Sequence, residues 1–212
     1  MTAPGGDLTR FTLVERGVHW VVGLSFVALL LSGLAFSHPR LFWLTTLFGG
    51  GQAARVLHPW IGMAFALSAV AMVLLWARDM GVDAEDRAWL RAIRHYAVHD
   101  RDNVPAAGKY NGGQKLFFWG MALLAAAYIV SGLVLWKPGG LPGLGPLYGT
   151  PVNVMRLVHY AATILGGLLL VVHVYLGTVA YPGTLGAMLH GTVTRAWARL
   201  HHPRWHEEQS GS

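Results

Sequence analysis

Four long apolar stretches constrain the fold of this chain more than any other feature of its sequence. They cover residues 18–36, 56–77, 116–136 and 154–179. Each is about 20 residues long, which is the length that an α-helix needs to cross a hydrocarbon layer of roughly 30 Å. Because lipid offers the backbone no hydrogen-bond partners, the four stretches predict an all-α membrane protein, a four-transmembrane-helix bundle.

The composition agrees with a membrane protein and narrows the choice of partners. Of the 212 residues, 54% are hydrophobic and only 12% are charged, which is unusual for a soluble domain. The chain contains no cysteine, so it cannot supply the thiolates of an iron–sulfur cluster, and any such cluster must belong to a partner. The net charge of +6 indicates attraction to anionic lipid headgroups, and no nucleic-acid partner is predicted.

The first apolar stretch is predicted to be a retained span and not a cleaved signal peptide. The segment before it mixes acidic and basic residues, namely Asp7, Arg10, Glu15 and Arg16, and the stretch ends in LSGLAFSHP, a poor cleavage site. Residues 1–212 are therefore expected to form one integral-membrane domain.

The lysine and arginine residues predict the orientation of the chain. With four spans, the N-terminal tail, the loop of residues 78–115 and the basic tail of residues 183–212 all lie on one side of the membrane. That side carries 12 of the 16 lysine and arginine residues. The positive-inside rule then places both termini in the cytoplasm.

A short amphipathic helix is predicted between the second and third spans, in the segment DAEDRAWLRAIRHYAVHD. It opens with Asp83 and Asp86 at capping-box spacing. Helical periodicity places Trp89, Ile93 and Tyr96 on one face. We expect this to be a surface helix on the cytoplasmic leaflet.

Three other segments outside the spans carry expectations. The apolar segment LFWLTTLF, residues 41–48, is too short to cross the membrane and is expected in its outer interface. Residues 137–151 are rich in glycine and proline and predict an outward-facing loop. The tail after Pro182 is basic and aromatic, which suits a headgroup layer or the edge of a partner, and Pro182 itself is expected to end the fourth helix.

Histidine residues mark two depths in the predicted spans. His159 and His173 are fourteen residues apart on the fourth span, which separates them by ~21 Å along the axis with an angular offset of about 40°, so both project from one face. The second span enters from outside with His58, and the first enters from the cytoplasm with His19. Depth therefore pairs His58 with His159 and His19 with His173.

Two facing imidazoles at one depth suit the two axial positions of a b-type haem, which would carry electrons because it has no open coordination site. Gly23, Gly62 and Gly177 each follow a candidate ligand by four residues and would clear space for a macrocycle. A lone histidine in a span is more often a packed ring than a ligand, but four that pair by depth favour two haem b groups. Surface positions are expected for the other seven: His38, His95, His99, His190, His201, His202 and His206.

Seven motifs resemble a known family. They are RFTLVERGVHW, LHPWIG, GKYNGGQKLFFW, SGLVLWKP, LVHY, HVYLG and HHPRW. In this order, from about Arg10 to Glu208, they closely resemble the membrane cytochrome b (gamma) subunit of respiratory formate dehydrogenases. The broader superfamily includes the cytochrome b subunits of nickel–iron hydrogenases. The segment VAYPG departs from the family, whose members often carry a tryptophan and a lysine there.

The resemblance implies the same two haem sites that depth suggests. The iron of an outer haem b would be bound by His58 and His159, and the iron of an inner haem b by His19 and His173. The implied partners are an iron–sulfur (beta) subunit, a molybdenum- or tungsten-containing formate dehydrogenase (alpha) subunit and membrane lipid. A higher oligomer of the complex is left open.

The resemblance also implies a quinone site beside the inner haem, formed by Asn111, Gly113 and His173. Quinone reduction takes up two electrons and two protons, so the quinone head must lie near both a haem edge and water. The loop KYNGGQK would offer backbone N–H groups and the Asn111 amide to the quinone carbonyls. Spacing alone favours a plain helix-entry loop with an Asn-Gly turn, and it is the resemblance that favours a quinone site.

The expected function is a dihaem electron conduit. It would take electrons from an iron–sulfur subunit on the periplasmic side and reduce menaquinone or ubiquinone near the cytoplasm, as the quinone-reducing membrane subunit of a formate:quinone oxidoreductase. Formate oxidation would take place on another subunit. Three alternatives remain: a nickel–iron hydrogenase cytochrome b, a stand-alone cytochrome b561-type quinone oxidoreductase, and a haem-free membrane anchor or transporter.

Overall fold

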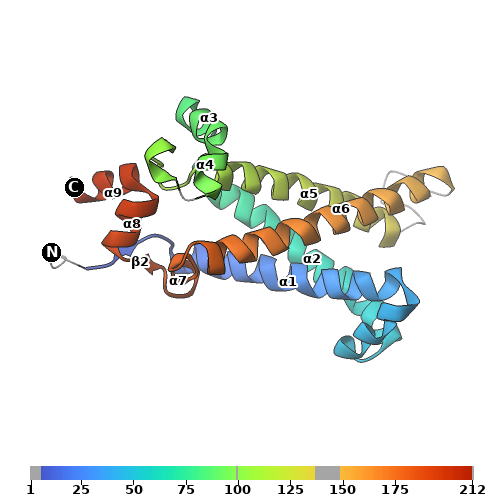
Figure 1. The fold of residues 1–212 in the computed structure, drawn as a ribbon. Helices are drawn as coiled ribbons and strands as arrows, with labels where there is room; N and C mark the ends of the chain where they lie inside the picture. Colours follow the sequence, from blue (N-terminus) through green and yellow to red (C-terminus); the bar gives the residue numbers. More distant parts are fainter. Residues whose placement is uncertain (1–5, 99, 137–148, 212) are drawn as a thin grey trace. The chain divides into compact units, whose positions relative to one another are not determined.

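The computed structural model describes residues 6–98, 100–136 and 149–211, and within them four long helices. These are α1 (Leu13–Ser37), α2 (Gly51–Trp76), α5 (Gly112–Trp136) and α6 (Thr150–Tyr175), shown in Figure 1. Each is long and apolar enough to cross a membrane. The prediction of an all-α membrane protein with four spans is confirmed.

The helices begin before the apolar stretches do. Helix α1 begins at residue 13 and not at 18, because Thr12 and Glu15 form a capping box: the Glu15 backbone N–H donates to Thr12 Oγ1 at 3.2 Å, and the Thr12 backbone N–H donates to Glu15 Oε2 at 2.7 Å. Hydropathy locates the part of a helix that faces lipid, whereas polar caps decide where it starts.

Helix α6 ends where the sequence predicted. It continues into one π-helical turn, η3 (Leu176–Ala180), and stops before Tyr181 and Pro182. Most of the predicted glycine- and proline-rich loop lies outside the described residues, and the last two residues of that segment, Thr150 and Pro151, already belong to α6.

The segment predicted for the outer interface is a 3₁₀-helix, η1 (Pro39–Phe48). His38 caps it, because its Nδ1 accepts a hydrogen bond from the Arg40 backbone N–H at 3.1 Å. The large apolar side chains of Phe42, Trp43 and Leu47 are exposed. This exposure suits an interfacial segment, which remains a prediction.

The predicted amphipathic helix is two short helices, α3 (Ala84–Arg91) and α4 (Ile93–Ala97). The capping box of Asp83 and Asp86 at the start of α3 is confirmed. The helix breaks at Ala92, and the expected face is kept only in part: the Trp89 and Tyr96 ring centres are 4.7 Å apart, whereas Ile93 is exposed.

The described chain forms two compact units. The first, here called the bundle unit, consists of Gly17–Val73 and Met121–His173, and the second, the tail unit, consists of residues 6–16, 74–120 and 174–211. All four candidate ligand histidines belong to the bundle unit, whereas Asn111 and Gly113 belong to the tail unit.

The core of the bundle unit is formed by all four long helices. Phe26, Phe65 and Ala69 are buried at its centre, and partly buried side chains surround them: Val22, Leu29, Ala125, Tyr128 and Leu170. The Tyr128 hydroxyl donates to the Ala162 carbonyl of α6 at 2.6 Å. A Cβ at Gly166 would lie 2.5 Å from the Tyr128 hydroxyl, so only glycine permits this close approach.

In the tail unit, the segment before α1 pairs with the segment after α6. Strand β1 (Leu8–Thr9) runs antiparallel to β2 (Thr192–Val193), with Leu8 opposite Val193. The tail that was predicted only as basic and aromatic folds into three short helices. These are α7 (Thr184–His190), α8 (Arg195–His201) and α9 (Pro203–Ser210).

The buried side chain of Arg10 connects the segment before α1 with the tail that follows α6. The Arg10 side chain is 4% exposed, and its Nη2 donates to the Lys109 carbonyl at 2.6 Å. Burial lowers the pKa of Arg10 to about 10. Its guanidinium carbon lies 5.0–5.8 Å from the centres of four aromatic rings, which belong to Phe11, Tyr110, Trp197 and Trp205.

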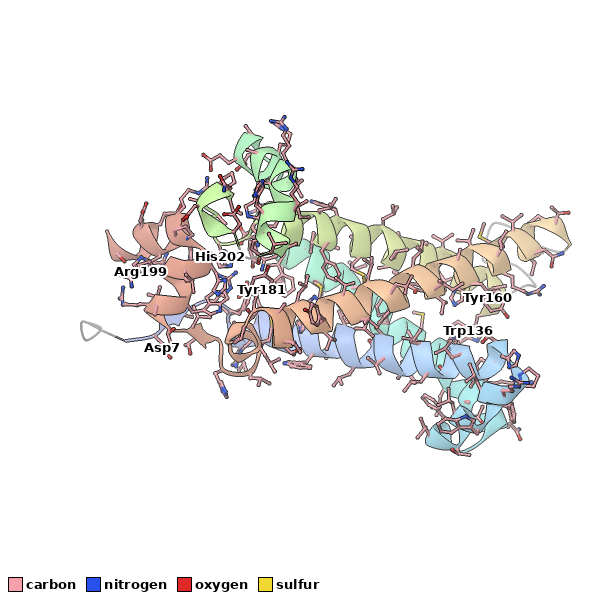
Figure 2. All side chains as sticks on the ribbon, viewed as in Figure 1. Asp7, Trp136, Tyr160, Tyr181, Arg199 and His202 are labelled. Atoms are coloured by element: carbon pink, nitrogen blue, oxygen red, sulfur yellow. The ribbon has the colours of Figure 1, made fainter. Side chains whose placement is uncertain are left out.

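His202, which is labelled in Figure 2, belongs to the tail unit and contacts this arginine. Its Nδ1 contacts the Gly108 carbonyl at 2.7 Å, and its Nε2 lies 3.2 Å from Arg10 Nη2. Burial first, and the Arg10 charge second, hold the pKa of His202 well below its usual value. The expectation of a surface position is wrong for this histidine, which is 3% exposed.

Candidate functional site

The structure brings together both histidine pairs that depth predicted. The ring centres of His58, from α2, and His159, from α6, are 6.4 Å apart with an angle of 65° between the ring planes. The ring centres of His19, from α1, and His173, from α6, are 6.0 Å apart with an angle of 45°. All four side chains belong to the bundle unit.

These separations fit two imidazoles that share one metal. A ring nitrogen binds a metal at about 2 Å, which puts the ring centre about 3 Å from the metal and the centres of two opposed rings about 6 Å apart. Haem iron needs only two such ligands from the protein, because the porphyrin supplies the others. Among the described residues, no group of three His, Asp or Glu side chains is placed to hold a bare metal ion.

A buried serine positions the ring of His58. The Oγ atom of Ser32, in α1, lies 2.7 Å from His58 Nδ1 and also donates to the Ala28 carbonyl at 2.8 Å. When the hydroxyl hydrogen is directed at that carbonyl, the Nδ1–H of His58 is the donor to Ser32. This tautomer leaves Nε2 of His58 without a hydrogen and free to bind a metal.

The same arrangement occurs at His159. The Oγ atom of Ser131, in α5, lies 2.8 Å from His159 Nδ1 and donates to the Ala127 carbonyl at 2.5 Å. Ser32 and Ser131 are both 0% exposed, so bulk water does not compete for these contacts. Sequence analysis missed both serines, although SGL occurs at residues 32–34 and again at 131–133.

Glycines lie beside both rings of the outer pair. A Cβ at Gly33 would lie 3.8 Å from His58 Cε1, and one at Gly132 would lie 3.6 Å from His159 Cε1. At Gly23 and Gly62, two of the glycines predicted to make room for a macrocycle, an added Cβ would meet no described atom closer than 4.0 Å.

His19 has a different environment. Its Nδ1 is buried, and no hydrogen-bond partner for it lies among the described residues. The Trp20 ring packs edge-on, with its centre 5.6 Å from the centre of the His19 ring. The serine arrangement of His58 and His159 is therefore not repeated at His19.

Asn111, a candidate quinone contact, caps helix α5. Its Oδ1 accepts from the Gln114 backbone N–H at 2.9 Å, and Gln114 Oε1 accepts from the Asn111 backbone N–H at 3.0 Å. The side chain is 5% exposed. These bonds fix the orientation of the amide and occupy its oxygen, so Nδ2 is the atom left to act as a donor.

The two glycines after Asn111 have a packing role. A Cβ at Gly112 would lie 2.6 Å from the Asp86 carbonyl oxygen, and one at Gly113 would lie 2.9 Å from Trp89 Cζ3. Both glycines therefore allow α3 to lie against the start of α5. The resemblance gave Gly113 a role in quinone binding, and the structure adds this structural reason for a glycine at the same position.

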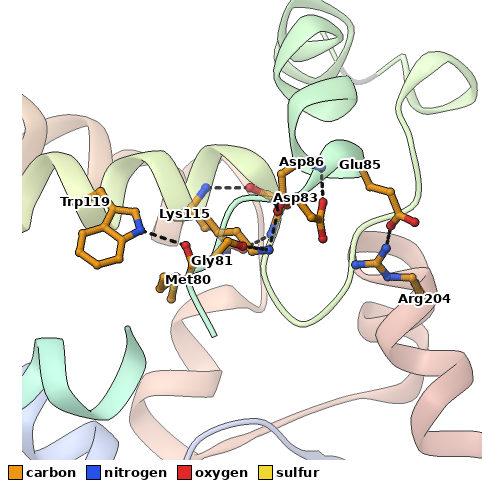
Figure 3. A network of polar contacts seen from close by, with 10 residues as sticks. Met80, Gly81, Asp83, Glu85, Asp86, Lys115, Trp119 and Arg204 are labelled. Carbon is orange, nitrogen blue, oxygen red and sulfur yellow. Dashed lines mark hydrogen bonds and ion pairs between the residues drawn. The ribbon is translucent and has the colours of Figure 1, made fainter. Parts of the chain in front are cut away.

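A buried ion pair holds the same two helices together (Figure 3). Lys115 Nζ lies 2.5 Å from Asp86 Oδ2 and donates to the Gly81 carbonyl at 2.9 Å. The side chains of Lys115 and Asp86 are 9% and 6% exposed. In the same network the Trp119 indole donates to the Met80 carbonyl, and Arg204 pairs with Glu85. The sequence contains one signal for the pair of Lys115 and Asp86, which is a lysine in the first turn of an otherwise apolar helix.

Comparison with known proteins identifies the family. The profile described as prokaryotic cytochrome b561 matches residues 10–191. The chain belongs to this cytochrome b family. The match includes the four long helices and all four paired histidines, so the cytochrome b expected from the histidine pattern is confirmed at the level of the family.

This cytochrome b is also similar to curated formate dehydrogenase subunits over nearly its full length. It is 33% identical over 202 residues to the cytochrome b556(fdo) subunit of Escherichia coli K12, covering 95% of this chain and 92% of that one. It is 33% identical to the nitrate-inducible cytochrome b556(Fdn) subunit of the same strain, covering 95% and 91%. For the Haemophilus influenzae cytochrome b556 subunit the identity is 29%, covering 95% and 83%. The resemblance inferred from the motifs is confirmed.

Proposed function

We propose that this chain is the dihaem cytochrome b subunit of a formate:quinone oxidoreductase. The observation that carries the proposal is the presence of two imidazole pairs, with ring centres 6.4 and 6.0 Å apart, on three of the four long helices. The relatives support the formate assignment, because they are named as cytochrome b556 subunits of formate dehydrogenases.

The proposed route crosses the membrane through the bundle unit. Bound haem b supplies one-electron redox chemistry at each histidine pair. His58 and His159 hold the outer site and His19 and His173 the inner site, while the apolar helices keep water away from both. Moving each electron inward generates membrane potential and costs about 2.3 kcal/mol per 100 mV, so a strongly reducing donor such as formate is required.

Quinone reduction is proposed at the cytoplasmic side. Asn111 Nδ2 and the Gly113 backbone would contact the head of menaquinone or ubiquinone. His173 is the third proposed quinone contact, as the resemblance implies. The capping bonds with Gln114 support this assignment, since they hold the Asn111 amide in a fixed orientation before substrate binds.

The proposed partners lie on the opposite side. Both termini are placed in the cytoplasm and the spans in the bacterial inner membrane, so an iron–sulfur (beta) subunit would meet the outer site and connect it to a molybdenum- or tungsten-containing alpha subunit. The lack of cysteine supports the need for such a partner, because this chain cannot hold the cluster itself.

A second candidate function follows from the family description, prokaryotic cytochrome b561. A stand-alone cytochrome b561, or the cytochrome b subunit of a nickel–iron hydrogenase, would use the same histidine pairs. Purification in mild detergent distinguishes these functions. An iron–sulfur subunit and a formate-oxidising subunit should accompany the chain if the formate assignment is correct.

The test of the dihaem proposal is a visible spectrum combined with a count of haem. The purified chain is expected to show a low-spin b-type band in the reduced-minus-oxidised spectrum and to contain two haem b groups per polypeptide. A colourless chain, or one with a single haem after expression with ample haem supply, would contradict the proposal.

For the quinone site, replacing Asn111 with serine is the informative change. Serine can still cap α5 through its hydroxyl, but it lacks the amide donor. Loss of one hydrogen bond to the substrate should lower kcat/KM for quinone by roughly 3- to 10-fold while both haems remain. The measurement is steady-state quinone reduction together with the haem content.

The matched control is Asn111→Ala, which removes both the cap and the donor. If the serine variant reduces quinone like the wild type and only the alanine variant is impaired, then Asn111 is a structural cap and not a quinone contact.

A further inference from the structure

Two serine–glycine pairs occupy equivalent positions in the bundle unit. Ser32 and Gly33 lie in α1 and contact the histidine of α2, and Ser131 and Gly132 lie in α5 and contact the histidine of α6. In each case the serine is on the helix that precedes the histidine in the chain. The bundle unit therefore contains the same local arrangement twice, once for each ring of the outer pair.

Each serine can form hydrogen bonds to its carbonyl and to its imidazole at the same time in only one way. Its hydroxyl hydrogen is directed at a carbonyl four residues earlier, at 2.8 Å for Ser32 and 2.5 Å for Ser131. Its oxygen is then the acceptor for the imidazole N–H at 2.7 and 2.8 Å. An acceptor at Nδ1 makes the opposite nitrogen a stronger electron donor to a metal.

We propose that Ser32 and Ser131 are positioning residues that fix the metal-binding tautomer of His58 and His159 and lower the midpoint potential of the outer haem. This inference rests on the proposed function, since it needs a haem between those rings. Stronger donation from the two imidazoles stabilises the ferric state over the ferrous state, which makes the haem harder to reduce. The inner haem should not depend on these serines, because the buried Nδ1 of His19 has no such partner among the described residues.

The test is a redox titration of the haem absorbance in the purified protein. Ser32→Ala and Ser131→Ala should each leave two haems bound and shift the midpoint potential of one haem upward. The double variant should shift that potential further and leave the other haem unchanged. A Ser32→Ala variant in the His159→Ala background, which is expected to lack the outer haem, should show no shift in the haem that remains.

The chain offers matched controls. Ser25, in α1, and Ser68, in α2, also donate to carbonyls four residues earlier, at 2.6 and 2.8 Å, but among the described residues neither is hydrogen-bonded to a histidine. Ser25→Ala and Ser68→Ala remove the same type of bond and should leave both potentials unchanged. Ser32→Thr and Ser131→Thr keep the hydroxyl and should keep the wild-type potential.

The outcomes separate this inference from the proposed function. Two haems with unchanged potentials in the double alanine variant would overturn the role of the serines and leave the dihaem conduit intact. If an alanine variant loses the outer haem, the threonine variant at the same position is the deciding measurement. If it retains the haem at the wild-type potential, the inference is supported. If it also loses the haem, the inference is overturned. Absence of haem from the wild-type chain would instead overturn the proposed function.

Discussion

Replacing His159 with alanine is expected to reduce the haem content from two per chain to one and to stop electron transfer from formate to quinone. His159 is proposed as one of two protein ligands at the outer site, so its loss would leave the iron with His58 alone and without the second ligand that the low-spin state needs. His173→Ala should also leave one haem, but at the outer site. Haem per polypeptide and formate-dependent quinone reduction measure both effects.

The two variants should differ in how their remaining haem is reduced. In the His159→Ala chain, quinol should still reduce the inner haem, because the resemblance implies that quinone reacts beside that haem. In the His173→Ala chain, formate should reduce the outer haem through the partner subunits, and quinol should not. His38→Ala serves as the control, since His38 only caps η1. Equal loss of both haems in either variant would show that the pairing by depth is wrong.

Replacing Lys115 with methionine is expected to lower the free energy of unfolding of the tail unit by about 3–5 kcal/mol, the usual cost of leaving a buried charge without its partner. Asp86 would keep a carboxylate that is 6% exposed and would lose the ammonium 2.5 Å away. The measurement is the loss of native structure in a denaturant titration in detergent.

Lys109→Met is the matched control for this change. Lys109 Nζ lies 3.9 Å from Glu15 and 3.6 Å from Asp79, and its side chain is 30% exposed. A solvent-screened pair of this kind should contribute under about 1 kcal/mol. A second variant that pairs Lys115→Met with Asp86→Asn should recover part of the loss, because it removes the unpaired charge. Equal effects of the two lysine variants would show that burial of the Lys115 pair does not matter.

Sequence alone was sufficient for the architecture and for the pairing of the histidines. Apolar stretches long enough to cross lipid have few alternatives, and a helix fixes the depth of each histidine along it. The ends of the helices were harder to predict from the sequence. Helix α1 begins five residues earlier than its apolar stretch because of Thr12 and Glu15, and hydropathy does not register such caps.

Contacts between helices account for what sequence analysis missed. Nothing in the order of residues says that Ser32 faces His58, because that contact depends on how α1 and α2 pack in the bundle unit. The burial of Lys115 has the same origin, since it requires α3 to fold back against the start of α5. A repeated short motif, here SGL, was the one local signal of the serine contacts.

The burial of Arg10 by residues of α8 and α9 has a consequence for biosynthesis. Arg10 and His202, which are in contact, are 192 positions apart in the sequence. A ribosome adding about 5–20 residues per second needs roughly 10 to 40 s to make the intervening chain. Until that part of the chain is made, the Arg10 guanidinium lacks the rings of Trp197 and Trp205. The contact between Arg10 and His202 can therefore close only in chains whose four spans have all been translated.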